Sequence, residues 1–138
     1  MEQHKILVVD DELLIRDLLY DFFAEKDCLI MTANDVNEAL ELLEKNSDFD
    51  VVLTDLKMDG EDGLSFVDKI RAESPQLPVI VMTGYPSVES AVEALRKRVY
   101  DYIIKPFNIN RLYATVRAAS EEHRQSKRQT TQVQKVYV

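Results

Sequence analysis

Short runs of apolar residues recur five times along the chain, each bounded by polar or turn-forming residues. Each run is only three or four residues long, and four of the five are rich in Val and Ile. Such short continuous runs are typical of the buried strands of a parallel sheet. The predicted strands are Ile6–Val9, Leu29–Met31, Val51–Leu53, Val79–Met82 and Tyr102–Ile104.

The segments that follow these runs carry apolar residues at the three- and four-residue spacing of an amphipathic helix. Residues with N-cap character, Asp35, Ser87 and Asn108, precede three of the stripes. The pattern therefore predicts five helices, of which the third, over residues 64–71, has the weakest stripe. The stripes are Ile15, Leu18, Leu19 and Phe22; Val36, Ala39, Leu40 and Leu43; Phe66, Val67 and Ile70; Val88, Ala91, Val92 and Leu95; and Ile109, Leu112 and Val116.

Strict alternation of strand and helix predicts an α/β fold with a parallel sheet and helices on both faces. Right-handed crossovers then favour a flavodoxin-like, doubly wound (βα)5 domain. Its five strands, numbered along the chain, are expected in the order 2-1-3-4-5. A length of 138 residues with 46% apolar residues is sufficient for one such domain with a real core.

Composition narrows the setting of this domain. No apolar run approaches the length of a membrane span, and the N-terminus lacks a signal-peptide pattern. The single cysteine, Cys28, rules out an intrachain disulfide, which favours a cytoplasmic protein. A net charge of −8 argues against direct nucleic-acid binding. Neither a membrane nor a nucleic acid is therefore an expected partner.

The charge is unevenly distributed. Residues 121–138 contain four basic and two acidic residues, a net of +2, which leaves −10 for the rest of the chain. We therefore expect a domain over residues 1–120 and a polar C-terminal tail or linker over residues 121–138. As an alternative, this segment continues the last helix toward an effector domain or a dimer partner.

The residues that carry chemistry stand at the ends of the predicted strands. Asp10 and Asp11 follow the first strand, Asp55 the third, Thr83 the fourth and Lys105 the fifth. Parallel strands end at the same edge of their sheet, and doubly wound folds bind ligands there. Taken singly, each residue fits a turn, a helix cap or a surface lysine equally well. Their coincidence at four strand ends instead predicts one site.

Three carboxylates at one edge repel one another unless a cation offsets their charge. Mg²⁺ suits the site, because it takes oxygen ligands and needs only one or two protein carboxylates. Asp11 and Asp55 are expected to bind it directly and Asp10 through water, with the backbone carbonyl of Lys57 as a further ligand. A carboxylate beside such an ion can act as a nucleophile toward a phosphoryl group. Asp55 is the expected nucleophile, with Lys105 and Thr83 stabilising the phosphoryl oxygens.

Four motifs make the chain resemble the receiver domain of two-component response regulators over about residues 4–120. This resemblance implies that Asp55 is the phosphoacceptor, that Asp10 and Asp11 hold Mg²⁺, and that Lys105 binds the phosphoryl group. It further implies that Thr83 and Tyr102 form a switch pair. The motifs are ILVVDDE (6–12), VVLTDLKMDGEDG (51–63), VMTG (81–84) and YIIKPF (102–107).

The resemblance also implies partners and a mechanism. A sensor histidine kinase or a phosphotransfer protein would donate the phosphoryl group. The domain would not be an enzyme, although it would catalyse its own phosphorylation and dephosphorylation. Thr83 and Tyr102 would relay the change to the face formed by the fourth helix, fifth strand and fifth helix. That face would bind a second copy or a downstream effector domain. Residues 83–107 resemble receivers of enhancer-binding transcription activators, and the Lys105–Pro106 bond would be cis.

Several positions depart from the family pattern or flank the site. Asp59 replaces the usual proline and is expected to alter Mg²⁺ affinity or the lifetime of the phosphorylated state. Arg98 and Val99 replace a common Gly-Ala pair, in which the glycine supplies a left-handed helix end; Arg98 would cost about 1 kcal/mol if it keeps that geometry. The added bulk of Val99 would bias Tyr102. Lys57 and Tyr85, two residues past Asp55 and Thr83, are expected to tune water access to the phosphoryl group; simple solvated loop residues are the alternative.

Three other functions fit the fold. A phosphatase with an aspartate nucleophile would need a second acid at position 57, where the chain has lysine. A flavodoxin-like cofactor carrier would need a phosphate-binding loop after the first strand, where Asp10 and Asp11 would repel phosphate. A receiver that acts only as a binding module would have lost the acids or Lys105. The phosphorylation switch is therefore the preferred function.

Overall fold

The computed structural model describes residues 3–58 and 61–137, and their side chains except those of residues 61 and 129–137. Five parallel strands form the main sheet in the order β2-β1-β3-β6-β7, which confirms the predicted fold and strand order. Two strands that were not predicted, β4 and β5, form a short antiparallel pair after β3. The strands are β1 His4–Val9, β2 Cys28–Ala33, β3 Val51–Asp55, β4 Lys57–Met58, β5 Glu61–Asp62, β6 Val79–Thr83 and β7 Asp101–Ile104.

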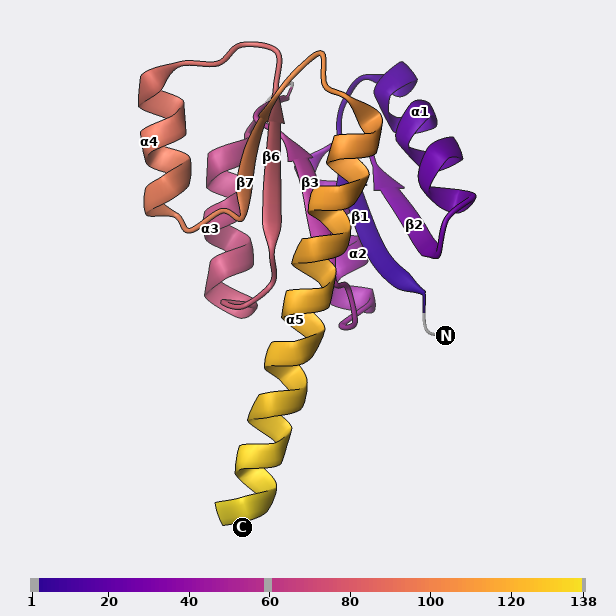
Figure 1. The fold of residues 1–138 in the computed structure, drawn as a ribbon. Helices are drawn as coiled ribbons and strands as arrows, with labels where there is room; N and C mark the ends of the chain where they lie inside the picture. Colours follow the sequence, from indigo (N-terminus) through magenta and orange to yellow (C-terminus); the bar gives the residue numbers. More distant parts are fainter. Residues whose placement is uncertain (1–2, 59–60, 138) are drawn as a thin grey trace.

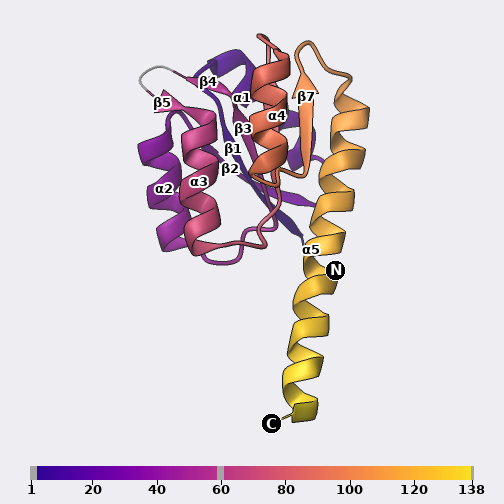
Figure 2. The ribbon, with the colours of Figure 1, turned by 90° about the vertical axis from the view of Figure 1, so that its left-hand side faces the viewer.

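Five helices enclose this sheet in two layers (Figures 1 and 2), with α1 and α5 on one face and α2, α3 and α4 on the other. Alternate residues of each strand supply the two cores. Ile6 and Val8 of β1 face the α1–α5 layer, and Leu7 and Val9 face the opposite layer. The helices are α1 Leu13–Ala24, α2 Val36–Lys45, α3 Gly63–Glu73, α4 Val88–Arg96 and α5 Ile109–Tyr137.

All three predicted N-caps are confirmed. The Asp35 carboxylate accepts the backbone N–H of Glu38 at 2.8 Å, and the Ser87 hydroxyl accepts that of Ser90 at 3.0 Å. The Asn108 side chain accepts two backbone N–H groups of the first turn of α5, at 3.0 and 3.1 Å. These contacts satisfy donors that would otherwise lack a partner within each helix.

The apolar stripes of two helices are only partly covered by the core. On α1, Leu19 and Phe23 are fully buried and Ile15 and Phe22 pack against the core, while Leu18 is 49% exposed. On α4 only Ala94 is buried, and Val88 and Leu95, two residues of the apolar stripe, are 82% and 74% exposed. The physical reason for α4 is its place beside β7, the short edge strand, where the sheet offers little surface to cover. Its apolar stripe therefore faces outward.

The residue after the end of α4 keeps the left-handed geometry that glycine commonly supplies at this position. Arg98 has a φ of 60°. The N–H of Val99 bonds to the carbonyl of Ala94 at 3.2 Å and the N–H of Arg98 to that of Leu95 at 3.0 Å. This is the pattern of a Schellman motif, which ordinarily favours glycine at the left-handed position. Here an exposed arginine, Arg98, occupies that position, so its backbone is strained.

Helix α5 continues well past residue 120, through the segment expected to be a tail or linker. His123 is buried, and the Arg124 guanidinium pairs with the Asp50 carboxylate at 2.9 Å. The first turn beyond residue 120 is thus part of the packed body, while the rest of α5 projects from it (Figure 1). Among the described residues, no helix combines the length and apolarity needed to cross a membrane.

Candidate functional site

The site lies where the order of the strands reverses. From β1 the chain moves outward to β2, then returns to β3 on the other side of β1. The carboxyl ends of β1 and β3 therefore border the crevice in which doubly wound folds bind their ligands. Asp10 and Asp11 directly follow β1, and Asp55 is the last residue of β3. The sheet thus brings together three acids that are far apart in the sequence.

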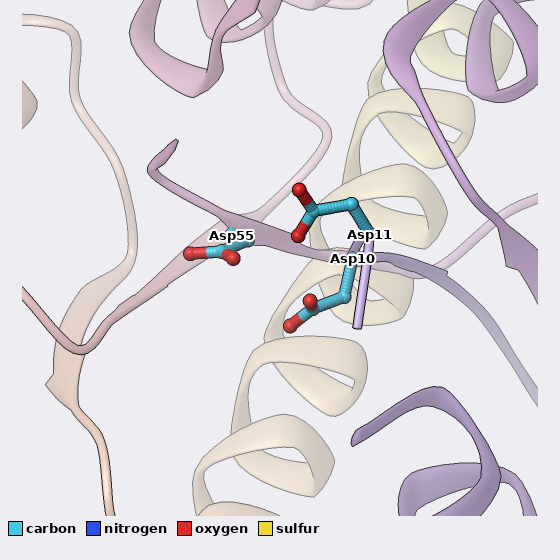
Figure 3. A group of neighbouring side chains, drawn as sticks. All are labelled: Asp10, Asp11 and Asp55. Atoms are coloured by element: carbon cyan, nitrogen blue, oxygen red, sulfur yellow. The ribbon is translucent and has the colours of Figure 1, made fainter. Parts of the chain in front are cut away.

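The three carboxylates form one cluster. Asp10, Asp11 and Asp55 each offer an oxygen, and these three oxygens lie within 4.8 Å of one another. Figure 3 shows Asp10 and Asp11 extending from the segment after β1 toward the side where Asp55 lies. Asp10 is fully buried and Asp55 is 5% exposed. A set of hard, anionic oxygen donors at this spacing fits Mg²⁺. The part of the Lys57 carbonyl in such a site stays a prediction.

The Lys105 side chain enters the same cluster from the end of β7. Its ammonium nitrogen lies 2.8 Å from a carboxylate oxygen of Asp10 and 3.4 Å from one of Asp55. A third acid, Glu12, lies 3.4 Å from the same nitrogen. The Lys105 ammonium therefore lies among three carboxylates, closest to that of Asp10 and within 3.4 Å of that of Asp55.

Burial and crowding perturb both charged partners. Burial raises the pKa of Asp55 from 3.8 to about 6, and the neighbouring charge of Asp10 adds to this, while Lys105 opposes it. For Lys105, burial alone would lower the pKa, but the hydrogen bond and charge of Asp10, with Asp55 and Glu12, raise it overall. The site thus holds a firmly cationic lysine beside a carboxylate that is unusually basic and still mostly ionised at neutral pH.

Thr83 lies at the same edge. It ends β6, one residue beyond Met82, the register partner of Asp55. Its side chain is fully buried, and its hydroxyl oxygen accepts the backbone N–H of Tyr85 at 2.9 Å. The Thr83 carbonyl accepts the N–H of Lys105 at 2.7 Å, which links the two strand ends. The expected cis Lys105–Pro106 bond is confirmed.

Tyr102 is not among the side chains that meet at the carboxylates. It lies on β7, half-buried against the core of the α2–α4 layer. Its hydroxyl reaches the start of α4, 2.7 Å from the hydroxyl of Ser90 and 3.4 Å from the backbone nitrogen of Ser87. Ser90 was not among the predicted site residues, because nothing along the chain indicates this contact between β7 and α4.

The residues expected to tune the site are only partly described. Lys57 and Tyr85 are exposed, and the Lys57 ammonium lies 5.1 Å from the centre of the Tyr85 ring. This is a cation–π distance, so the two residues contact each other beside the site. Asp59 lies outside the described residues. The tuning roles of all three stay predictions.

Two further residues near the site were missed. A Cβ added to Gly63, the first residue of α3, would lie 2.3 Å from the carbonyl oxygen of Asp55, so only glycine fits there. The signal was available, because the chain has only three glycines and this one stands directly before a predicted helix. Glu12 binds Lys105, and its backbone N–H donates to the Asp10 carboxylate at 2.9 Å.

The chain matches a known protein family over most of its length. A family model described as "Response regulator receiver domain" matches residues 6–117. The transcriptional regulatory protein ZraR of Escherichia coli K12 is 40% identical over 114 residues, which are 83% of this chain and 26% of ZraR. This chain thus spans about a quarter of the length of that relative. The predicted resemblance to receivers of transcription activators is confirmed.

Solved receiver structures superpose well. A CheY-like receiver domain protein from Methanospirillum hungatei JF-1 has a TM-score of 0.86 at 26% identity, covering 91% of this chain and 99% of that one. The beryllofluoride-activated NtrC4 receiver domain, a dimer in solution, has a TM-score of 0.82 at 36% identity, covering 88% of this chain and 99% of that one.

Proposed function

Because the chain belongs to the family of response regulator receiver domains, we propose that it is a two-component signalling switch in which Asp55 accepts a phosphoryl group. The observation that carries this proposal is the Lys105 ammonium, 3.4 Å from the Asp55 carboxylate inside a cluster of three acids. If Lys105 served only to form a structural ion pair, a single acid would be sufficient. Because the acids outnumber the lysine, an excess of negative charge remains that a divalent cation would offset, and the site can take a phosphoryl group only with that cation bound.

Asp55 has the properties of a nucleophile toward phosphorus. Its pKa of about 6 leaves roughly nine tenths of the carboxylate ionised at pH 7, and a more basic oxygen is a better nucleophile. The Asp55 oxygen forms a bond to phosphorus as the bond from phosphorus to the donor breaks. The donor is a histidine imidazole of a sensor kinase or phosphotransfer protein, or the acetate of acetyl phosphate. Lys105 orients the phosphoryl oxygens and stabilises their charge.

We propose that Asp10, Asp11 and Asp55, with the backbone carbonyl of Lys57, hold Mg²⁺. When bound, this ion supplies positive charge against the acids and the phosphoryl oxygens. The buried Asp10, bonded to Lys105 and to the Glu12 N–H, keeps the ammonium within reach of the site. Lys57 and Tyr85, in contact above the strand ends, limit the approach of water to the phosphorylated Asp55.

Phosphorylation is proposed to act through Thr83 and Tyr102. The Thr83 hydroxyl, bonded to Tyr85 in the unphosphorylated structure, turns to donate to a phosphoryl oxygen. Tyr102 then moves into the space that Thr83 leaves. Only two pre-existing arrangements with different affinities for the phosphoryl group are required.

The face formed by α4, β7 and α5 is suited to bind the partner that receives the signal. Here Val88, Leu95 and Ile104 are 82%, 74% and 53% exposed. An exposed apolar surface of this kind does not stabilise a single domain and is typical of a protein–protein interface. We propose that the phosphorylated domain uses this face to bind a second copy of itself. The NtrC4 receiver, dimeric when activated, supports this. The length of the relatives supports an effector domain as a further partner.

Acetyl phosphate and Mg²⁺ test the proposal directly. Intact-mass analysis should show the addition of one phosphoryl group, lost when a chelator is added or in Asp55→Asn. Asp21→Asn, an exposed acid on α1, is the matched control and should be phosphorylated like the wild type. Absence of phosphorylation in the wild type would contradict the switch and favour a receiver that acts only as a binding module.

A further inference from the structure

Helix α4 is held firmly at its C-terminal end. The Arg71 guanidinium, from α3, donates to the carbonyls of Lys97 and Arg98, at 3.2 and 3.0 Å, and to that of Leu77 at 2.6 Å. The Lys97 ammonium binds both carboxylate oxygens of Asp68 at 2.8 Å. Together with the Schellman bonds, these contacts connect the C-terminal end of α4 to α3 and to the segment that leads into β6.

The N-terminal half of α4 has far less to hold it. Ala94, the one buried residue among those of α4, lies near the C-terminal end. Val88 is 82% exposed and Val92 40% exposed. Apolar burial is the main source of helix stability in a protein. The first turns of α4 therefore depend largely on polar contacts.

Those contacts converge on the Ser90 hydroxyl. Its oxygen lies 2.7 Å from the Tyr102 hydroxyl, 2.9 Å from the Ser87 hydroxyl and 3.2 Å from the Ser87 carbonyl. One donated and two accepted hydrogen bonds fill the capacity of a hydroxyl group. Without this hydroxyl, Tyr102 would keep only the 3.4 Å contact with the Ser87 nitrogen. Ser90 is thus the link between the switch tyrosine and the loosely packed end of α4.

We infer that Ser90 is a positioning residue, whose hydrogen bond to Tyr102 latches the N-terminal end of α4 in the unphosphorylated arrangement. The inference rests on the proposed phosphorylation of Asp55. In the latched state Tyr102 is bonded to α4, and Thr83 is bonded to Tyr85. Movement of Tyr102 toward the space left by Thr83 breaks the latch. The freed end of α4 then pivots about the end that Arg71 holds.

The free energy of the hydrogen bond between Ser90 and Tyr102 can be expressed as a change in the ratio of the two arrangements of α4. One hydrogen bond of ordinary strength changes an equilibrium by about fivefold. If the activated arrangement is the minor one, a ligand that binds only this arrangement gains apparent affinity by the same factor when the latch is removed. Beryllofluoride with Mg²⁺, a non-covalent mimic of the phosphoryl group, is such a ligand.

The test is a double-mutant cycle with Ser90→Ala and Tyr102→Phe, each of which removes one partner of the bond. The dissociation constant of beryllofluoride in saturating Mg²⁺ is measured by amide NMR, and urea unfolding reports stability. Each single variant should bind about fivefold more tightly than wild type, and the double variant no more tightly than either. Ser90→Thr, which keeps a hydroxyl, should restore the wild-type affinity.

Each outcome decides the matter. Fivefold effects that do not add support the latch. If the wild type binds beryllofluoride and Ser90→Ala binds equally tightly, or if the two effects add, the latch is refuted and the phosphorylation switch survives. If the wild type does not bind beryllofluoride, the assignment of Asp55 fails and the latch fails with it. A tighter-binding Ser90→Ala that is not rescued by Ser90→Thr points to helix propensity and also refutes the latch.

Discussion

Replacing Asp55 with asparagine should stabilise the metal-free protein at neutral and alkaline pH. The carboxylate of Asp55 is 5% exposed and lies beside the buried Asp10, so its ionised form is disfavoured in the folded state. Asparagine has nearly the same shape and no charge. The substitution therefore removes an electrostatic cost of folding while leaving the packing of the site almost unchanged.

The magnitude follows from the pKa of Asp55, which burial and Asp10 raise from 3.8 to about 6. Between these two values the folded state holds a proton that the unfolded state has lost, so stability falls as pH rises through this window. Each pKa unit corresponds to 1.36 kcal/mol, which gives a full cost of about 3 kcal/mol above pH 6. Below pH 3.8 both states are protonated and the cost vanishes.

Urea unfolding between pH 4 and pH 8 in the presence of EDTA measures this difference. Asp55→Asn should exceed the wild type by about 3 kcal/mol at pH 8 and by little at pH 4. Asp21→Asn makes the same change in net charge at an exposed position and is the matched control; a gap of the same size in this variant would mean that net charge, and not the site, is responsible. Mg²⁺ should close the gap at pH 8 by stabilising only the wild type. A gap independent of pH, or a less stable Asp55→Asn at pH 8, would refute the reasoning.

Three further substitutions test other parts of the structure. Arg98→Gly should raise the free energy of unfolding by about 1 kcal/mol, because Arg98 has a φ of 60°; unchanged stability in urea would count against strain there. Gly63→Ala should cost 2 kcal/mol or more and weaken beryllofluoride binding, since its Cβ would meet the Asp55 carbonyl at 2.3 Å; normal binding and stability would contradict this close approach. Burial lowers the pKa of His123 below 6.5, so protonation opposes folding and stability falls as pH drops below that value. His123→Gln should lose less stability than wild type between pH 7.5 and 5.5; an equal loss would exclude His123 as the cause.

Helix α4 shows most clearly where sequence reasoning failed and why. Val88, Val92 and Leu95 have the spacing of a buried stripe, yet all three are exposed. Periodicity reports that a helix has an apolar side, but does not report whether the domain itself covers that side. Here the apolar side belongs to the face proposed for dimerisation. A local pattern that is satisfied only by a partner marks a functional surface.

The β4–β5 pair and the cross-element contacts were beyond sequence analysis for a different reason. Strands of two residues have no periodicity to detect. The hydrogen bond between Ser90 and Tyr102 and the contact of Lys57 with Tyr85 join residues that lie 12 and 28 positions apart. Such contacts depend on how two elements are placed against each other, which no local pattern specifies.

The sequence by itself determined the five strands of the main sheet, the helix caps and the residues at the strand ends, because these follow from alternation of apolar runs and local hydrogen bonding. From the parallel topology it also determined that Asp10, Asp11, Asp55 and Lys105 would share one edge. Only the tertiary structure decided the pairing within that edge. It placed the Lys105 ammonium 2.8 Å from Asp10 and 3.4 Å from Asp55, and left the stripe of α4 exposed. Distances and burial depend on packing between elements, and packing is a property of the whole fold.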